Sequence, residues 1–324
     1  MTILKRLTSP MRIRLLAIII PASVFTALLN HRLTDAPNID DVSQNLRAAY
    51  NLAYNGIFSK DAELRRPDNY REPLPVAALA LYIKMDPRLS SGQSNISINR
   101  SSALLAVKEH NLFWAFLCLV GLGAIVFASV RPPWLALIAV VAADTLTYVY
   151  FLKRDEIINR TLTEIQAATL LVWFAFFLIR ALETKKAAWF AAAGILLGGL
   201  ALTKAAFLYV GIGLIAAIAL AYGVWPPPQW RRLRVFALVG VMTASMAVVV
   251  LPWMVRNFVQ FESFEISQRG GLALMSRAYY KMNDTEFKGA FYHFARGGLR
   301  ENLGSYLGYS PRDLEVMGRL RRLK

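Results

Sequence analysis

Seven ionisable residues from separate parts of the chain are candidates for one polar site. Each lies in a polar segment close to an apolar run, and the seven are Asp40, Asp41, Arg71, Glu72, Glu164, Lys204 and Arg256. Acidic side chains of this kind can transfer protons, and basic ones can bind anions. Ionisable groups at membrane depth are costly and usually face a cavity or a partner. The sequence therefore predicts a polar site where the fold brings these residues together.

The same residues also have a simpler interpretation. Charged side chains within a turn of a membrane span are commonly solvated or extend toward the headgroups. We favour that interpretation for Lys153–Glu156, and also for Asp41 and Glu72 as ordinary loop acids. Both interpretations stay open for Glu164 and Lys204. The three histidines are too scattered to predict a metal site: His31, His110 and His293.

Composition indicates a membrane protein. Of the 324 residues 56% are hydrophobic, and the mean hydropathy is +0.39, whereas a soluble domain averages about 45–50% apolar residues. The net charge is +16, but Lys and Arg cluster in short segments between apolar runs. This placement favours contact with anionic lipid and argues against a nucleic-acid partner. The single cysteine, Cys118, excludes an intrachain disulfide.

Seven transmembrane helices are predicted. Ala188–Trp225 is apolar except for Lys204, and its 38 residues are too many for one crossing, so we divide it into two spans near Thr203-Lys204. The N-terminal run follows several basic residues without a small-residue cleavage site, which favours an uncleaved anchor. The other runs are Ile13–Asn30, Asn111–Val130, Trp134–Leu152, Glu164–Ile179 and Val235–Pro252.

The distribution of positive charge sets the orientation. With the N-terminus in the cytoplasm, the short inner segments hold eleven Lys or Arg residues and the short outer loops hold four, as the positive-inside rule requires. Leu74–Met85 is too short to span and contains Pro75, and counting it as a span would reverse every later loop. We therefore predict an interfacial or re-entrant helix there, and an amphipathic helix at Val42–Tyr54.

This topology defines two regions of the chain. Residues 1–258 form the predicted transmembrane domain, with an outer loop at 31–110 that carries the two short helices. Residues 259–324 form an extracytoplasmic tail, a candidate start of a further C-terminal part. All the candidate site residues then fall on the outer face.

Several motifs, in this order along the chain, resemble the GT-C membrane glycosyltransferases. The resemblance is to the branch that contains the protein O-mannosyltransferases and the aminoarabinose transferases. The motifs are Ile39-Asp40-Asp41, Gly56-Ile57-Phe58-Ser59, Tyr70-Arg71-Glu72-Pro73-Leu74-Pro75, Thr163-Glu164, Gly198-Gly199-Leu200-Ala201-Leu202-Thr203-Lys204, and Pro252-Trp253-Met254-Val255-Arg256-Asn257 with Gly270-Gly271 behind it. The last motif is the most specific.

The resemblance implies an all-α GT-C-like fold and an enzyme of the bacterial inner membrane. Its donor would be a sugar linked to polyprenyl phosphate, transferred with inversion on the outer face. The matching catalytic carboxylate is Asp40, with Asp41 beside it to position the acceptor. Lys204 and Arg256 would bind the donor phosphate, and Arg71, Glu72 and Glu164 would line the cavity. The resemblance names neither the sugar nor the acceptor, and a divalent metal requirement stays open.

Two departures keep alternatives open. Many relatives carry an aromatic Pro-Leu-Tyr segment where this chain has Pro73-Leu74-Pro75, and they are usually longer, with further spans. A non-catalytic assembly partner derived from a transferase is therefore one alternative. Another is a transporter or flippase subunit for a lipid-linked or anionic substrate. A transporter would be expected to show an inverted repeat and charges near the midplane, whereas the charges of this chain gather at the outer face.

Overall fold

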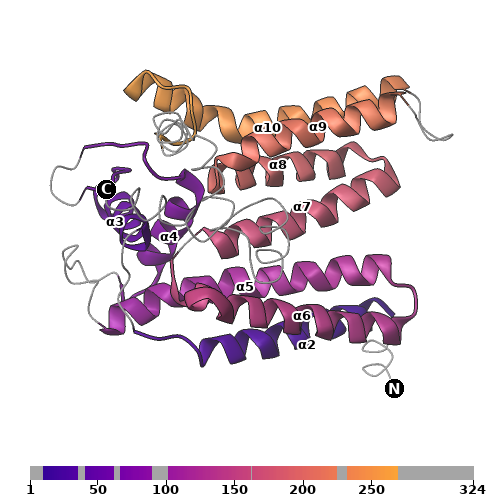
Figure 1. The fold of residues 1–324 in the computed structure, drawn as a ribbon, viewed down its shortest axis with the longest axis horizontal. Helices are drawn as coiled ribbons and strands as arrows, with labels where there is room; N and C mark the ends of the chain where they lie inside the picture. Colours follow the sequence, from indigo (N-terminus) through magenta and orange to yellow (C-terminus); the bar gives the residue numbers. More distant parts are fainter. Residues whose placement is uncertain are drawn as a thin grey trace, which may run out of the picture. The chain divides into compact units, whose positions relative to one another are not determined.

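The computed structural model describes residues 10–35, 41–61, 66–89, 101–161, 163–224 and 232–268. The chain divides into two units, Met1–Gln268 and Arg269–Lys324, and all the described residues belong to the first. Every regular element in them is helical, as the sequence predicted (Figure 1). The predicted tail at 259–324 lies outside the described residues from position 269 onward.

Two groups of long helices build the first unit (Figure 1). In one group, three helices pack against one another: α2 (Pro10–Asn30), α5 (Ser101–Ser129) and α6 (Pro133–Glu156). The second group consists of α7 (Glu164–Thr184), α8 (Ala187–Thr203), α9 (Ala206–Val224) and α10 (Arg232–Phe261). α7 packs against both α5 and α8 and so joins the two groups.

Six of these helices are long and apolar enough to cross a membrane: α2, α5, α6, α7, α9 and α10. Large apolar side chains on them face outward, as Leu146 on α6 and Val248 on α10 do, which suits contact with lipid. The chain is therefore a multi-pass helical membrane protein. The predicted break near Thr203-Lys204 is confirmed, because α8 ends at Thr203 and α9 begins at Ala206. α8 has 17 residues and is shorter than the other six.

Glycines allow α8 to pack closely against α10. A Cβ atom added to Gly194 would clash with the main-chain oxygen of Met242, and one added to Gly198 would lie 3.0 Å from the main-chain oxygen of Met246. The two glycines are four residues apart and therefore lie on the same face of α8. Both main chains can approach there only because these positions carry no side chain.

Two short helices lie at the end of the bundle where α2 and α6 finish and α5 and α7 begin (Figure 1). They are α3 (Asp41–Asn55) and α4 (Pro73–Met85), which confirms the predicted helices at Val42–Tyr54 and Leu74–Met85. They pack against each other through Leu46, Ala49, Val76 and Leu79. We call the end of the bundle that carries these two helices the α3–α4 end.

The helix that carries the predicted span Asn111–Val130 is longer than that span. α5 begins at Ser101, within the predicted outer loop at 31–110. Lys108, in the part of α5 before the span, is 0% exposed, and its Nζ donates to the main-chain oxygen of Thr34 at 2.6 Å. A buried lysine with a hydrogen-bond acceptor is compatible with a helix.

Candidate functional site

Asp41 and Arg71 form an ion pair at the α3–α4 end. Arg71 Nη2 lies 2.9 Å from Asp41 Oδ1 and also donates to the main-chain oxygen of Asp41 at 2.7 Å. The Arg71 side chain is 2% exposed, whereas that of Asp41 is 40% exposed. Arg71 thus reaches from the segment before α4 to the first residue of α3. A buried guanidinium needs such a carboxylate, so Asp41 has a structural task that the sequence did not predict.

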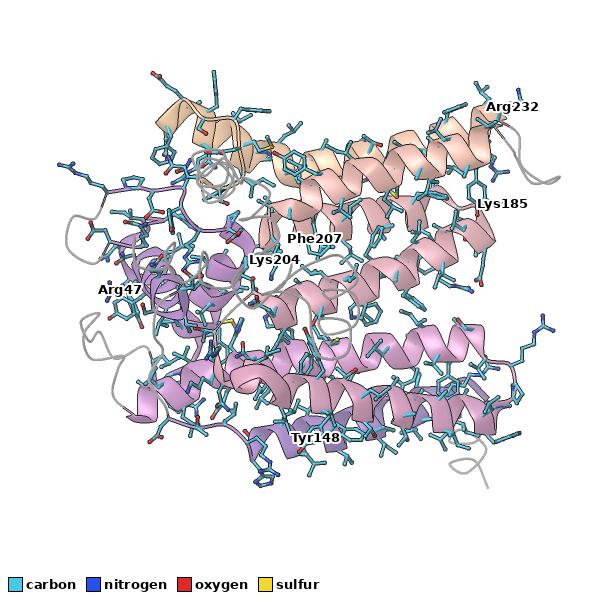
Figure 2. The ribbon with its side chains drawn as sticks, in the orientation of Figure 1. Arg47, Tyr148, Lys185, Lys204, Phe207 and Arg232 are labelled. Atoms are coloured by element: carbon cyan, nitrogen blue, oxygen red, sulfur yellow. The ribbon has the colours of Figure 1, made fainter. Side chains whose placement is uncertain are left out.

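Glu164 and Lys204 form a second ion pair at this end. Glu164 is the first residue of α7, and Lys204 directly follows α8. Lys204 Nζ donates to Glu164 Oε1 at 2.9 Å, and each side chain is 36% exposed. The other oxygen, Oε2, is buried and accepts no hydrogen bond from the described residues. Figure 2 shows Lys204 at the α3–α4 end, away from Lys185 and Arg232 at the opposite end.

Arg256 lies among aromatic rings near the end of α10. Its Cζ is 4.5 Å from the ring centre of Trp253, 5.2 Å from that of Phe261 and 5.7 Å from that of Phe58. Its Nη1 donates to the main-chain oxygen of Asp68 at 3.1 Å and to Asn257 Oδ1 at 2.8 Å. These contacts are cation–π interactions and hydrogen bonds that fix the guanidinium in place.

The segment around Asp68 connects these groups. The main-chain oxygen of Asp68 accepts a hydrogen bond from Arg256, and Arg71, three residues after Asp68, pairs with Asp41. One stretch of chain therefore connects the two arginines and Asp41. α4 follows and packs against α8, which leads to Lys204. The fold therefore brings the described candidates to one end of the bundle. Asp40 lies outside the described residues.

Glu72 differs from its neighbour Arg71 in its side-chain contacts. It occupies the position before α4, has an extended backbone and makes no side-chain capping bond there. Its side chain makes no hydrogen bond or ion pair with the described residues and is half-buried. A half-buried carboxylate without a partner among the described residues can be reached by solvent and by ligands.

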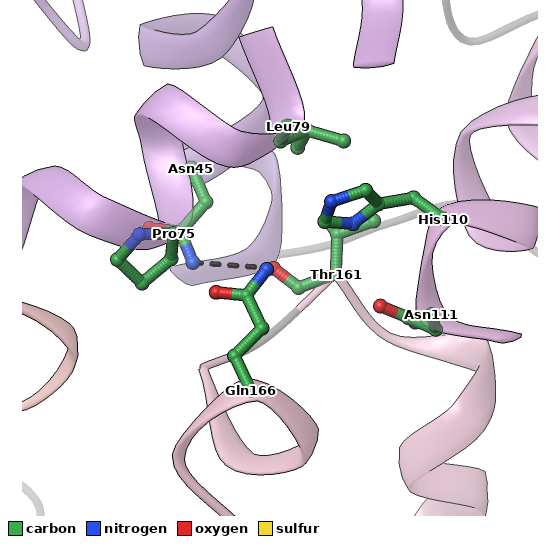
Figure 3. A pocket seen from close by; sticks show the side chains of 7 residues that line it. All are labelled: Asn45, Pro75, Leu79, His110, Asn111, Thr161 and Gln166. Atoms are coloured by element: carbon green, nitrogen blue, oxygen red, sulfur yellow. Dashed lines mark hydrogen bonds between the residues drawn. The ribbon is translucent and has the colours of Figure 1, made fainter. Parts of the chain in front are cut away.

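A small polar pocket is lined by residues of α3, α4, α5 and α7 and by Thr161 (Figure 3). It leaves roughly 10 Å³ for the centre of a water-sized molecule, which is about what one water needs. Its lining consists of seven buried residues, Asn45, Pro75, Leu79, His110, Asn111, Thr161 and Gln166. Among these seven, the histidine is the one side chain that is acidic or basic. Thr161 Oγ1 and Gln166 Oε1 have no hydrogen-bond partner among the described residues. The pocket is suited to one hydroxyl group or one water molecule.

The histidine in this pocket accepts a hydrogen bond and is neutral. Trp114 Nε1 donates to His110 Nε2 at 3.0 Å, and a ring nitrogen that accepts must be unprotonated. The proton of His110 is therefore on Nδ1. Tyr82 packs against the imidazole with ring centres 5.3 Å apart, and burial raises the pKa of Tyr82 to about 12. Neither ring carries a charge at neutral pH, so this pocket could not be predicted from the charged residues of the sequence.

One acidic residue deep in the bundle was missed. Asp144 lies in the middle of α6, is 0% exposed, and neither of its carboxyl oxygens has a hydrogen-bond partner among the described residues. Asp144 was not among the predicted site residues, which all lie in polar segments near the outer face. The signal was present, because Asp144 is the only charged residue in the apolar run Trp134–Leu152.

Metal ligands do not cluster in the described part of the chain. No group of three or more His, Cys, Asp or Glu side chains there is arranged to hold a metal ion. Comparison of the chain with families of known proteins, with curated protein sequences and with solved structures gave no match.

Proposed function

We propose that the chain is an inverting glycosyltransferase of the bacterial inner membrane. It would move a sugar from a polyprenyl-phosphate donor to an acceptor on the extracytoplasmic face. The proposal includes a GT-C-like fold with seven spans, in which α8 crosses as a short helix. At about 1.5 Å per residue, its 17 residues extend roughly 25 Å, somewhat less than the ~30 Å hydrocarbon core.

The observation that carries the proposal is the half-exposed ion pair between Lys204 and Glu164. An ammonium group has three N–H donors, and the described residues occupy only one of them, through Glu164 Oε1. Lys204 can therefore bind a phosphate oxygen while Glu164 keeps it in position. Both residues are at the α3–α4 end, together with Asp41, Arg71 and Arg256.

Arg256 supports the same function in a different way. Both donors of its Nη1 are used, by Asp68 and Asn257, which leaves Nε and Nη2 for a ligand. The surrounding rings hold the guanidinium rigidly, and a fixed cation stabilises a developing phosphate charge better than a mobile one. As the donor's glycosidic bond breaks, the bonding electrons pass to the phosphate oxygen that Lys204 and Arg256 would face.

The acceptor side of the reaction requires a carboxylate. In the proposed step, Asp40 takes the proton from the acceptor hydroxyl or amine while that group attacks the anomeric carbon from the side opposite the phosphate. The new glycosidic bond forms as the bond to the phosphate breaks, which inverts the anomeric centre. Asp41 is committed to Arg71, and this favours Asp40 over Asp41 as the base.

The test measures binding of polyprenyl phosphate, the group common to all such donors, to the purified protein in nanodiscs. We expect Lys204→Gln to weaken binding about 10- to 100-fold, because a charge-assisted hydrogen bond contributes about 1.5–3 kcal/mol and each 1.4 kcal/mol is tenfold. Lys84→Gln is the matched control, since Lys84 is exposed at the end of α4 in the same part of the molecule.

Two outcomes would contradict the proposal. If Lys204→Gln and Lys84→Gln bound polyprenyl phosphate equally well, Lys204 would have no part in phosphate recognition. If the unsubstituted protein bound polyprenyl phosphate no better than a neutral polyprenol, the donor class itself would be wrong. If Lys204→Gln unfolds at the same temperature as the unsubstituted protein, a loss of binding does not come from misfolding.

A transporter for a lipid-linked or anionic substrate is a second candidate, favoured by one observation. Transporters commonly bury acidic groups inside the membrane, and Asp144 is such a group. The two functions differ in their product. Transfer of labelled sugar to a new acceptor favours the glycosyltransferase, and movement of an unmodified substrate across a vesicle membrane favours the transporter.

A further inference from the structure

Asp144 belongs to the inward-facing stripe of α6. Ala136, Val140 and Asp144 follow one another at intervals of four residues, and all three are 0% exposed. Leu146, two residues beyond, points outward and is 72% exposed. The helical period therefore turns Asp144 toward α2 and α5, the helices against which α6 packs.

The depth of Asp144 makes its surroundings apolar. It follows the first residue of α6 by eleven positions and precedes the last by twelve, which places it roughly 17 Å from either end. Phe25 of α2 packs against Tyr148, one turn further along α6, with ring centres 5.7 Å apart. An acid this far from both ends is near the middle of the ~30 Å hydrocarbon core.

No positive group among the described residues forms a hydrogen bond with this acid. The charged residues of α2 are near its start, at Arg12 and Arg14, and those of α5 are near its beginning, at Lys108 and Glu109. An isolated carboxylate in apolar surroundings is very costly unless it becomes neutral.

We propose that Asp144 is a proton-binding site inside the membrane, shared by α2, α5 and α6. The proton converts the carboxylate to an uncharged acid that the three helices can enclose. Release of the proton places one negative charge among apolar side chains, so the packing of α6 on α2 and α5 depends on whether the site is occupied. Asp144 lies roughly 17 Å along α6 from the end of that helix, and the proposed transferase centre at the α3–α4 end does not include it.

A proton suits the site better than a metal cation. Sodium needs several oxygen ligands. Among the described residues, Asp144 belongs to no group of three or more His, Cys, Asp or Glu side chains that could hold a metal ion. One carboxyl group is sufficient to bind a proton.

Infrared difference spectroscopy of the protein in lipid tests the proposal. At neutral pH we expect the spectrum of the unsubstituted protein minus that of Asp144→Asn to contain the carbonyl band of a protonated carboxylic acid. Asp35→Asn is the matched control, because Asp35 is exposed, and its difference spectrum should contain the carboxylate bands instead. A carboxylate signal for Asp144 at neutral pH would overturn the proposal. If adding sodium converted the acid band into carboxylate bands, the site would bind sodium in place of a proton.

A second measurement needs no variant. A lipid-soluble carbodiimide reacts with protonated acids: the acid proton moves to a carbodiimide nitrogen, the carboxyl oxygen bonds to the central carbon, and rearrangement gives a stable N-acylurea. We expect mass spectrometry to find one added carbodiimide on the peptide with Asp144 and none on the peptide with Asp35. Labelling of Asp35 with none of Asp144 would overturn the proposal. None of these outcomes bears on binding of polyprenyl phosphate, so the inference and the proposed function can fail separately.

Discussion

Replacing Asp41 with alanine would leave the buried guanidinium of Arg71 without its carboxylate. Arg71 Nη2 would retain only the main-chain oxygen of residue 41, at 2.7 Å, and its Nε has no partner among the described residues even in the unsubstituted chain. Breaking a fully buried ion pair costs about 3–5 kcal/mol. Because the Asp41 side chain is 40% exposed, solvent screens part of the interaction, and we expect a loss of about 2–3 kcal/mol.

Asp41→Asn separates the charge from the hydrogen bond. The amide oxygen can still accept from Arg71, so the loss should be the difference between a charge-assisted and a neutral hydrogen bond, about 1 kcal/mol. The double variant Asp41→Ala with Arg71→Met should lose less than the sum of the single changes, because neither charge then lacks a partner. The assay is the free energy of unfolding by denaturant in detergent micelles.

Asp35→Ala is the control for this series. Asp35 is exposed, and substitutions at such positions usually change stability by no more than about 0.5 kcal/mol. The reasoning would be refuted if Asp41→Ala also stayed within that range, or if the single and double variants were simply additive. Either result would mean that Asp41 and Arg71 are not energetically coupled, and Asp41 would again be available as a catalytic base.

Three further predictions concern the catalytic base, the topology and helix packing. Asp40→Asn should lower the rate of sugar transfer by about 10²–10⁴-fold with unfolding unchanged, and transfer at the full rate would exclude Asp40 as the base. A periplasm-active reporter fused after Leu272 should be active and one fused after Arg232 silent, whereas the reverse pattern would invert the membrane orientation. Gly194→Val should destabilise the protein by at least about 1–3 kcal/mol, because the side chain would force α8 from α10. Gly240→Val, which has open space around its added Cβ, should be close to neutral, and equal losses in both variants would contradict this account of the packing.

The helices followed from the sequence wherever an apolar run was bounded by clear polar residues. The break after Thr203 was predictable because 38 apolar residues exceed one crossing, and α4 was predictable from a short run with prolines at its start. The beginning of α5 was not predictable from the sequence. Lys108 reads as a loop residue by its charge, and only the fold supplies the acceptor on Thr34 that buries it.

The site followed from the sequence only in part. That Glu164 and Lys204 would be at the same end of the bundle followed from the alternation of spans, but their direct pairing depends on side-chain geometry between α7 and α8. Pairing of Asp41 with Arg71 depends on how the segment before α4 folds back onto α3. Asp144 was overlooked because averaging hydropathy over a run conceals one acid, although its position within the helical period was readable.

Asn159 ties the N-terminal span to the rest of the protein over a long stretch of chain. Its side chain accepts from the main-chain nitrogen of Thr34 at 2.6 Å, 125 residues earlier, and donates to the main-chain oxygen of Arg32 at 2.9 Å. At about 5–20 residues per second, a ribosome needs roughly 6–25 s to synthesise those 125 residues. The residues after α2 therefore lack this clamp throughout the synthesis of α5 and α6, and the clamp can close only once Asn159 has been made.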